Sequence, residues 1–271
     1  MARLLGSFCL LLSLAPTALA ANVSIKWHGQ SFFEIKSSKG TVVAIDPHNI
    51  EGFGRIEVKA DVVLISHYHI DHNAPQPIAN VAKTKVLCGL KNAKVSNPYL
   101  GAPANRKDDE FNEIDEKVKD VHIQSMASYH DKVQGMQRGK NSIFIIDVDG
   151  VRIVHLGDLG HTLTDAQVKK LGKVDVLMVP VGGIYTLNGK DAKEVVAQVQ
   201  PRKYVVPMHY SVPRVYEFLL GIDEFLEDQD EKWIKKYKDN ELVVDSEEAA
   251  RKNPIIAVLS HLPKEEKKED K

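Results

Sequence analysis

The segment DVVLISHYHIDHN, residues 61–73, joins an apolar run directly to a cluster of histidines and acids. Residues 61–66, which contain the run VVLI, predict a strand buried on both faces of a sheet. His67, His69, Asp71 and His72 then follow within six residues. A buried core tolerates such a cluster poorly, and a surface loop does not need it. The segment therefore predicts a strand that ends at a functional site.

The spacing of these four side chains favours a metal site. In an extended segment, residues two apart point the same way, so His67 and His69 can share one ion. Asp71 and His72 are neighbours, and a turn at Ile70 could direct them to a second ion. Imidazole suits zinc, iron and manganese, and a carboxylate adds negative charge. The alternative is a set of solvated loop residues, but so many potential ligands directly after a buried strand favour metal.

A site for two ions needs more ligands, and three later residues stand in equivalent positions. His130, Asp158 and His209 each follow an apolar, strand-like segment where it gives way to a loop. Loops at strand ends are where α/β proteins generally place functional residues. The remaining histidines are weaker candidates: His48 could lie near the site, His28 and His161 could support it, and His122, His155 and His261 are predicted to be structural.

Strand-like and helix-like segments alternate along the chain. Residues 23–47 predict a meander of short strands, and residues 142–158 predict a hairpin with Asp149 and Gly150 at its turn. Buried strands are also predicted in VHIQSMASYH, VDVLMVPV and KYVVPMHY. TDAQVKKLG and DAKEVVAQVQ predict helices, the first ending at Gly172 and the second stopped by Pro201. This order indicates two sheets with helices outside.

Weaker patterns predict the connections of the fold and its last third. They predict helix-flanked connections at 76–83 and 90–95, an exposed loop at 98–117, a helix near 214–226, and strands near 241–244 and 255–259.

The two ends of the chain differ from this pattern. Residues 1–20 carry an early arginine, an apolar run and an A-x-A end, which predict a signal peptide cleaved after Ala20. The run is shorter than the roughly 20 apolar residues of a membrane span, so no integral span is expected after cleavage. We expect one folded domain over 21–262 and a disordered, charged tail over 263–271.

Charge and cysteine content narrow the function classes. The formal net charge is -1, which gives no electrostatic reason to expect a nucleic-acid partner. Once the signal peptide has left, Cys88 is the only cysteine, so the mature chain has no internal disulfide. We expect an exported protein, periplasmic or secreted, with the bacterial periplasm favoured because secreted animal domains more often carry disulfides. The oligomeric state is open.

The polar segments resemble the motifs of the metallo-β-lactamase superfamily. SHYHIDH matches H-x-H-x-D-H, and YHD, GDLGH and PMHY follow in the family's order. The similarity runs from about Ile25 to Tyr210. WHGQSFFEI, RGKNSIF and VDVLMVPVGGIYT resemble the branch of metal-dependent hydrolases that contains L-ascorbate-6-phosphate lactonase and N-acyl-phosphatidylethanolamine phospholipase D. Gln30 departs from that branch, in which many relatives carry histidine.

The resemblance implies an α/β fold, the four-layer αββα sandwich with two mixed sheets, helices outside and metals at one edge. The positions that match the family's ligands are His67, His69 and His130 for a first metal, Asp71, His72 and His209 for a second, and Asp158 as the bridge between them. The resemblance thus implies two divalent cations, with zinc favoured and manganese or iron as alternatives.

Such a pair of ions implies hydrolysis of an ester, lactone or phosphodiester in a small molecule by a metal-bridging hydroxide. Asp71 would orient the nucleophile or accept its proton, and His161 and Tyr185 are candidates to protonate the leaving group. Tyr185 is equally compatible with ordinary packing. The alternative is a non-hydrolytic metalloprotein of the same fold, an iron oxidoreductase or a metal-binding module. β-Lactams are not expected as substrates, because the closer resemblance is to another branch.

Overall fold

The computed structural model describes residues 21–91 and 110–262. Its strands form two large sheets and one short pair. The six-stranded sheet contains, in spatial order, β15 (Glu241–Asp245), β1 (Asn22–Trp27), β2 (Phe33–Lys36), β3 (Val42–Ile45), β4 (Val62–Ile65) and β5 (Lys85–Cys88). The eight-stranded sheet contains β14 (Ile234–Lys236), β16 (Ile255–Val258), β13 (Tyr204–Met208), β12 (Val176–Pro180), β11 (Val151–His155), β10 (Lys140–Val148), β9 (Val121–Tyr129) and β8 (Asp115–Val118). The short pair joins β6 (Leu90–Lys91) to β7 (Glu110–Phe111). The predicted leader and tail lie outside the described residues.

Both large sheets are mixed, as predicted. β1, β2 and β3 form the expected antiparallel meander, and β4 and β5 then add parallel to β3. In the second sheet, β10 and β11 form the predicted hairpin, with Val148 paired to Val151 across Asp149 and Gly150. From β11 onward, β12, β13 and β16 pair in parallel, so their carboxyl ends meet at one edge.

The hydrophobic residues form two cores. The larger one lies between the sheets, where it includes Val62 and Leu64 of β4, and continues beneath α1 and α2. The smaller one lies on the other face of β4, where Val63 and Ile65 pack with Tyr68 and neighbouring loop residues. Alternate residues of a strand point to opposite faces, so β4 is buried on both sides, which confirms the prediction from its continuous apolar run.

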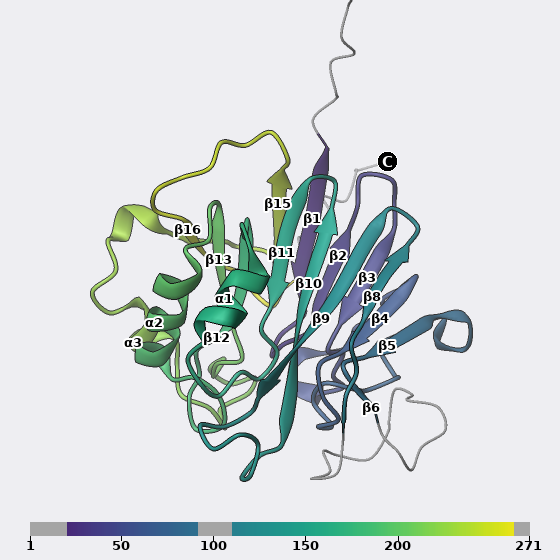
Figure 1. Cartoon of the computed structure of the whole chain (residues 1–271), viewed down its shortest axis with the longest axis horizontal. Helices are drawn as coiled ribbons and strands as arrows, with labels where there is room; N and C mark the ends of the chain where they lie inside the picture. Colours follow the sequence, from purple (N-terminus) through teal and green to yellow (C-terminus); the bar gives the residue numbers. More distant parts are fainter. Residues whose placement is uncertain (1–20, 92–109, 263–271) are drawn as a thin grey trace, which may run out of the picture.

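The helices are α1 (Asp165–Leu171), α2 (Gly189–Val199) and α3 (Asp223–Leu226), with 3-10 turns at Glu51–Phe53, Val81–Lys83 and Glu231–Trp233. α1 begins at Thr164, which forms a capping box with Gln167, and ends at Gly172, as predicted. Figure 1 shows all three helices on the left, beside β12 and β13. Within 21–91 and 110–262, loops rather than α-helices cover the outer face of the six-stranded sheet, and no helix there is long and apolar enough to span a bilayer.

Three of the weaker predictions were wrong. The helix expected near 214–226 is reduced to α3, because Val212 and Ser211 donate backbone hydrogen bonds to Tyr216 and Leu220 and fold the segment into a closed loop. Residues 76–83 hold only a 3-10 turn, and 90–91 form a strand rather than a helix-flanked connection. The described part of the expected loop at 98–117 contains β7 and most of β8 instead. β7 pairs with β6, and β8 pairs with β9.

Candidate metal centre

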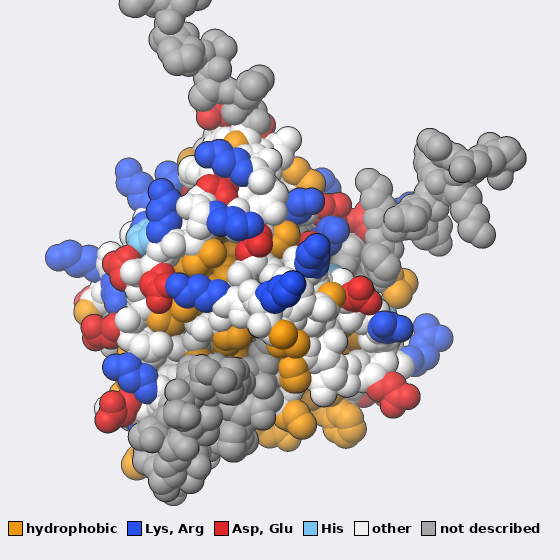
Figure 2. Space-filling model, turned by 90° about the vertical axis from the view of Figure 1, so that its right-hand side faces the viewer, with side chains coloured by type: hydrophobic (Ala, Val, Ile, Leu, Met, Phe, Trp, Pro, Cys, Tyr) orange, Lys and Arg blue, Asp and Glu red, His pale blue; other side chains and the backbone are white. Residues whose placement is uncertain are grey.

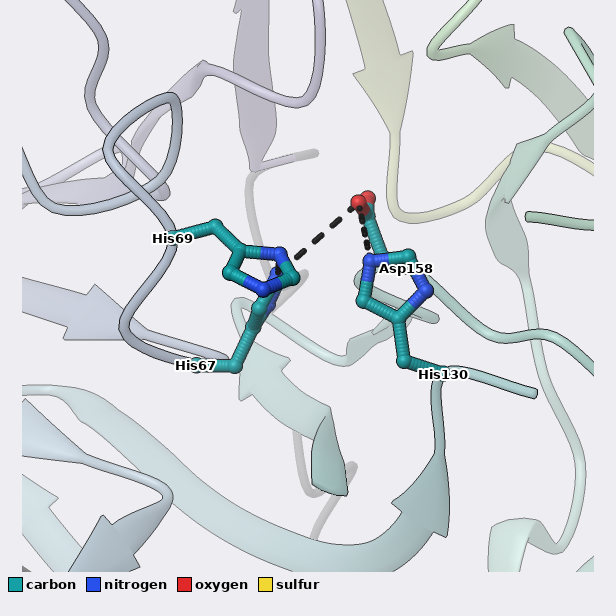
Figure 3. A group of neighbouring side chains, drawn as sticks. All are labelled: His67, His69, His130 and Asp158. Carbon is teal, nitrogen blue, oxygen red and sulfur yellow. Dashed lines mark hydrogen bonds and ion pairs between the residues drawn. The ribbon is translucent and has the colours of Figure 1, made fainter. Parts of the chain in front are cut away.

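The predicted ligands lie at the ends of strands from both sheets. His67 to His72 follow β4, His130 follows β9, Asp158 follows β11 and His209 follows β13. The structure brings all seven side chains together in two adjacent groups. Figure 3 shows four of them pointing toward one another: His67 and His69 from one loop, His130 and Asp158 from two others.

The first group contains those four side chains, each of which offers a ligand atom within 4.8 Å of the others. His67 Nε2 lies 3.0 Å from His69 Nδ1. His130 Nε2 lies 3.1 Å from Asp158 Oδ2, and His67 Nε2 lies 3.8 Å from the same oxygen. Three imidazoles and one carboxylate therefore face a common point.

The second group contains Asp71, His72 and His209, under the same limit. His72 Nε2 lies 3.6 Å from Asp71 Oδ2. His72 Nε2 and His209 Nε2 each lie 3.1 Å from Asp158 Oδ2. This one oxygen of Asp158 thus lies within 3.1 Å of side chains from both groups.

Asp46 organises the back of the site. Its Oδ2 lies 3.0 Å from His72 Nδ1 and accepts a 2.6 Å hydrogen bond from Ser66 Oγ, while its Oδ1 accepts from the Ser66 N–H. Ser66 Oγ in turn lies 2.9 Å from His67 Nδ1. Asp46 is fully buried and has a φ of 49°, in the left-handed region. A carboxylate that holds the far nitrogen of an imidazole fixes its tautomer and orientation, as in many metal sites.

Gln30 lies in the turn between β1 and β2, and it contacts the second group twice. Its Nε2 donates to Asp71 Oδ2 at 3.1 Å, and its backbone carbonyl accepts from the N–H of His209 at 3.1 Å. Trp27 Nε1 donates to the same carbonyl at 2.9 Å. Gln30 therefore holds two of the candidate ligands in place from behind.

Burial and charge act in opposite directions on these groups. Burial alone would raise the pKa of Asp158, but His209 and His72 hold it well below its usual range. Burial alone would lower the pKa of His72, yet Asp158, Asp71 and Asp46 raise it well above its usual range. Burial lowers the pKa of His69 to about 4 and that of His67 well below normal, so both rings are neutral near pH 7. The carboxylates therefore favour positive charge at His72, whereas the rings of His67 and His69 stay neutral.

The donor set fits divalent cations of the zinc, manganese or iron type. Neutral imidazole nitrogens and carboxylate oxygens are the ligands these ions prefer. One oxygen of Asp158 lies 3.1 Å from three imidazole nitrogens. Such crowding of donor atoms around one carboxylate oxygen is typical of ligands that surround a cation. Among the described residues, Nδ1 of His130 and Nδ1 of His209 are buried without a hydrogen-bond partner. The contacts of the Nε2 atoms with Asp158 therefore orient both rings.

Asp131 shapes the loop that follows His130. Its Oδ1 accepts from the backbone N–H of Val133 and Gly135, and its Oδ2 from those of Gln137 and Arg138, at 2.7–2.9 Å. Burial would raise its pKa, but these donors lower it. One carboxylate thus fixes the loop whose residues form a wall of the site.

Changing Asp131 to asparagine should lower the free energy of unfolding by about 1–3 kcal/mol, because an amide N–H₂ would face two N–H donors. Urea denaturation of the metal-free protein measures the loss. The control is Asp149→Asn, at a partly exposed turn where the carboxylate accepts from Ser38 and where asparagine tolerates the φ of 50°. That variant should lose less than about 1 kcal/mol. Equal losses in both variants would contradict the role given to Asp131.

A cavity of about 690 Å³ opens beside the two groups. Tyr185 lines it, and the Arg138 guanidinium lies 5.6 Å from the centre of its ring. Tyr216 also lines it, and burial, followed by Asp71 and Asp158, raises its pKa to about 12. His161 is not among the lining residues: its Nε2 accepts from the Tyr129 N–H and its Nδ1 lies 2.7 Å from the Thr162 carbonyl oxygen.

The other histidines have partners outside the two groups. His48 Nε2 lies 3.1 Å from the carbonyl oxygen of His28, and burial lowers its pKa to about 4. His155 is fully buried and contacts the Ser31 carbonyl oxygen at 2.9 Å. His122 pairs with Asp115 at 2.6 Å on the surface. Sequence reasoning gave no role to Asp46, which directly follows β3, or to Arg138, which begins the RGKNSIF motif. It also missed Tyr216, which no local motif marks.

Comparison with known proteins places this geometry in context. Residues 24–209 match the family described as a beta-lactamase superfamily domain. A UPF0173 protein of Pyrococcus abyssi is 31% identical over 196 residues, which cover 69% of this chain and 83% of that protein. A UPF0173 metal-dependent hydrolase of Thermococcus onnurineus is 30% identical over 200 residues, with coverages of 70% and 85%.

A solved structure is similar over most of its length. It is the crystal structure of a candidate Zn-dependent hydrolase of the metallo-beta-lactamase superfamily from Thermotoga maritima. The sequence identity is 28% and the TM-score is 0.62, and the alignment covers 88% of this chain and 98% of that one. The similarity confirms the predicted metallo-β-lactamase fold, although among the described residues α-helices lie only beside the eight-stranded sheet.

Proposed function

This chain belongs to the beta-lactamase superfamily, and from that membership we propose that it is a hydrolase that holds two divalent cations. The convergence of both groups on Asp158 Oδ2 carries the proposal. The first cation would be held by His67, His69 and His130, the second by Asp71, His72 and His209, with Asp158 between them. The names of the relatives support metal-dependent hydrolysis, and the imidazole-rich donor set favours zinc.

When bound, such a cation pair supplies a water of lowered pKa and a Lewis acid for the scissile bond. Asp71 would orient that water or accept its proton, since Gln30 fixes the carboxylate at the cavity wall. Tyr185 and Tyr216 line the same cavity, and the Tyr216 hydroxyl, whose pKa is raised to about 12, keeps its proton at neutral pH. Tyr185 would protonate a leaving group, and Tyr216, whose raised pKa makes it a weak acid, would donate a hydrogen bond to it. His161 is not proposed for this role, because both of its ring nitrogens contact backbone groups, those of Tyr129 and Thr162.

An ester, lactone or phosphodiester of a small molecule is the proposed substrate. The purified protein should contain about two equivalents of zinc or manganese, and chelation should abolish turnover of a panel of such compounds. Added metal should restore it. One equivalent of iron with no hydrolysis of any panel member would favour the oxidoreductase alternative and contradict the hydrolase.

We also propose that the protein is exported. Residues 1–20 have the charge, apolar run and A-x-A end of a cleaved leader. Protein recovered from the periplasm or medium should begin at Ala21 when its N-terminus is sequenced. An intact Met1 on all recovered protein would contradict export by this route.

A further inference from the structure

Large hydrophobic side chains are exposed around the mouth of the cavity. Ile70 is 84% exposed, Met136 70% and Phe218 74%. Ile70, Met136 and Tyr185 line the cavity itself, and the Phe218 ring lies 5.5 Å from that of Tyr216, which also lines it. We define the apolar rim as Ile70, Met136, Ile184, Tyr185, Phe218 and Leu220.

The apolar rim is unusual on this molecule. Among the described residues, the other exposed large hydrophobic side chains are Val81, Val243 and Leu262, on separate segments of the chain. Figure 2 shows charged side chains over much of one face, with hydrophobic ones at its centre and toward its lower right. A concentration of exposed apolar side chains at a cavity marks a binding surface more often than chance.

Part of the apolar rim is held in a costly backbone conformation. Ile184 has a φ of 55°, in a region that β-branched residues avoid, and its side chain is half exposed. Arg138 Nη2 donates to the Ile184 carbonyl oxygen at 3.0 Å, and the Gly183 N–H donates to Leu187. The structure thus stabilises a strained loop that presents an apolar side chain to solvent, which is typical of functional loops.

The polar inventory of the cavity disfavours a highly charged substrate. Arg138 is the one lysine or arginine among its described lining residues, and it already contacts Ile184 and the Tyr185 ring. The Gln30 amide is likewise used by Asp71. Beyond the candidate ligands, the wall therefore offers mainly apolar surface.

We propose that the substrate carries an apolar chain, which lies along the apolar rim while its ester, lactone or phosphodiester group reaches the candidate ligands. The proposal rests on the hydrolase function above and names its substrate class. The occupant is a single dissolved amphiphilic molecule. A chain bound there would stay in contact with water on one side. We therefore expect each methylene to raise the affinity about twofold, which is half the free energy of the roughly fourfold gain on full burial.

The probes are 4-nitrophenyl butanoate and 4-nitrophenyl octanoate, both below their micelle concentrations, with zinc-loaded protein. The octanoate ester, with four more methylenes, should have a kcat/KM about 16-fold higher. Met136→Gln combined with Phe218→Gln should reduce this ratio to about twofold, because it removes two apolar contacts of the chain. The matched control combines Val243→Gln with Leu262→Gln, two exposed side chains outside the apolar rim, and should keep the wild-type ratio.

Binding of sodium butanoate and octanoate, measured by calorimetry, separates the two proposals. Tighter octanoate binding without ester turnover would support the apolar rim and contradict the hydrolase. Turnover with no dependence on chain length would do the opposite. A gain seen only with phosphatidylcholine vesicles, or a dimer that Met136→Gln with Phe218→Gln dissociates, would assign the apolar rim to a membrane or a second copy and overturn the inference.

Discussion

Replacing Asp158 with alanine should lower kcat by about 10³-fold or more and reduce the bound metal to one equivalent or less. Its Oδ2 is the atom that both groups share, at 3.1 Å from three imidazole nitrogens. Loss of several kcal/mol of transition-state stabilisation corresponds to about 10³-fold in rate. Elemental analysis and initial rates on the best panel substrate measure the two effects.

The control for this change is Asp147→Ala, which also removes an acid from the eight-stranded sheet. Asp147 pairs with Arg152 at 2.7 Å, is partly exposed and belongs to neither group of candidate ligands. That variant should keep its metal and its rate and lose at most about 1 kcal/mol of stability. An Asp158→Ala protein with two equivalents of metal and normal turnover would remove the basis of the proposed function.

Changing Asp46 to asparagine should weaken metal binding by about 10–100-fold without removing a ligand. The side-chain shape is kept, and asparagine tolerates the φ of 49°, so the change isolates the carboxylate's effect on His72 and Ser66. We also expect a loss of about 1–3 kcal/mol in the free energy of unfolding, because an amide N–H₂ replaces an acceptor in a fully buried network.

Competition with a fluorescent chelator measures the affinity, and urea denaturation measures the stability. Asp149→Asn serves again as the control, since it makes the same chemical change at another left-handed position. If Asp46→Asn lost stability but bound metal as tightly as the wild type, Asp46 would be a structural residue and not a support for His72.

Much of the fold was predictable because the signals that determine it are local. The apolar run before His67 predicted a strand buried on both faces, and Val62 and Val63 indeed belong to different cores. Thr164 and Gly172 marked the ends of α1 correctly. The candidate ligands could be chosen because each stands where a strand ends, and the ends of neighbouring parallel strands meet at one edge.

The remaining features depend on contacts between distant segments. Asp46 meets His72 from 26 positions away, and Gln30 meets Asp71 from 41. The segment 214–222 has helix-like spacing, but Ser211 and Val212 bond across it and close a loop that leaves Phe218 exposed. Neither periodicity nor residue type encodes such closures, because tertiary hydrogen bonds outweigh weak helix propensity.

The candidate ligands come from both halves of the sandwich: His67 to His72 follow a strand of the six-stranded sheet, whereas His130, Asp158 and His209 follow strands of the eight-stranded one. A cation held by both sets would act as a reversible cross-link between the halves. Only the folded chain presents the two sets together, so a free cation at 100 times its Kd would add about 2.7 kcal/mol to the stability. Metal supply would then govern how long the protein survives, as well as how fast it works.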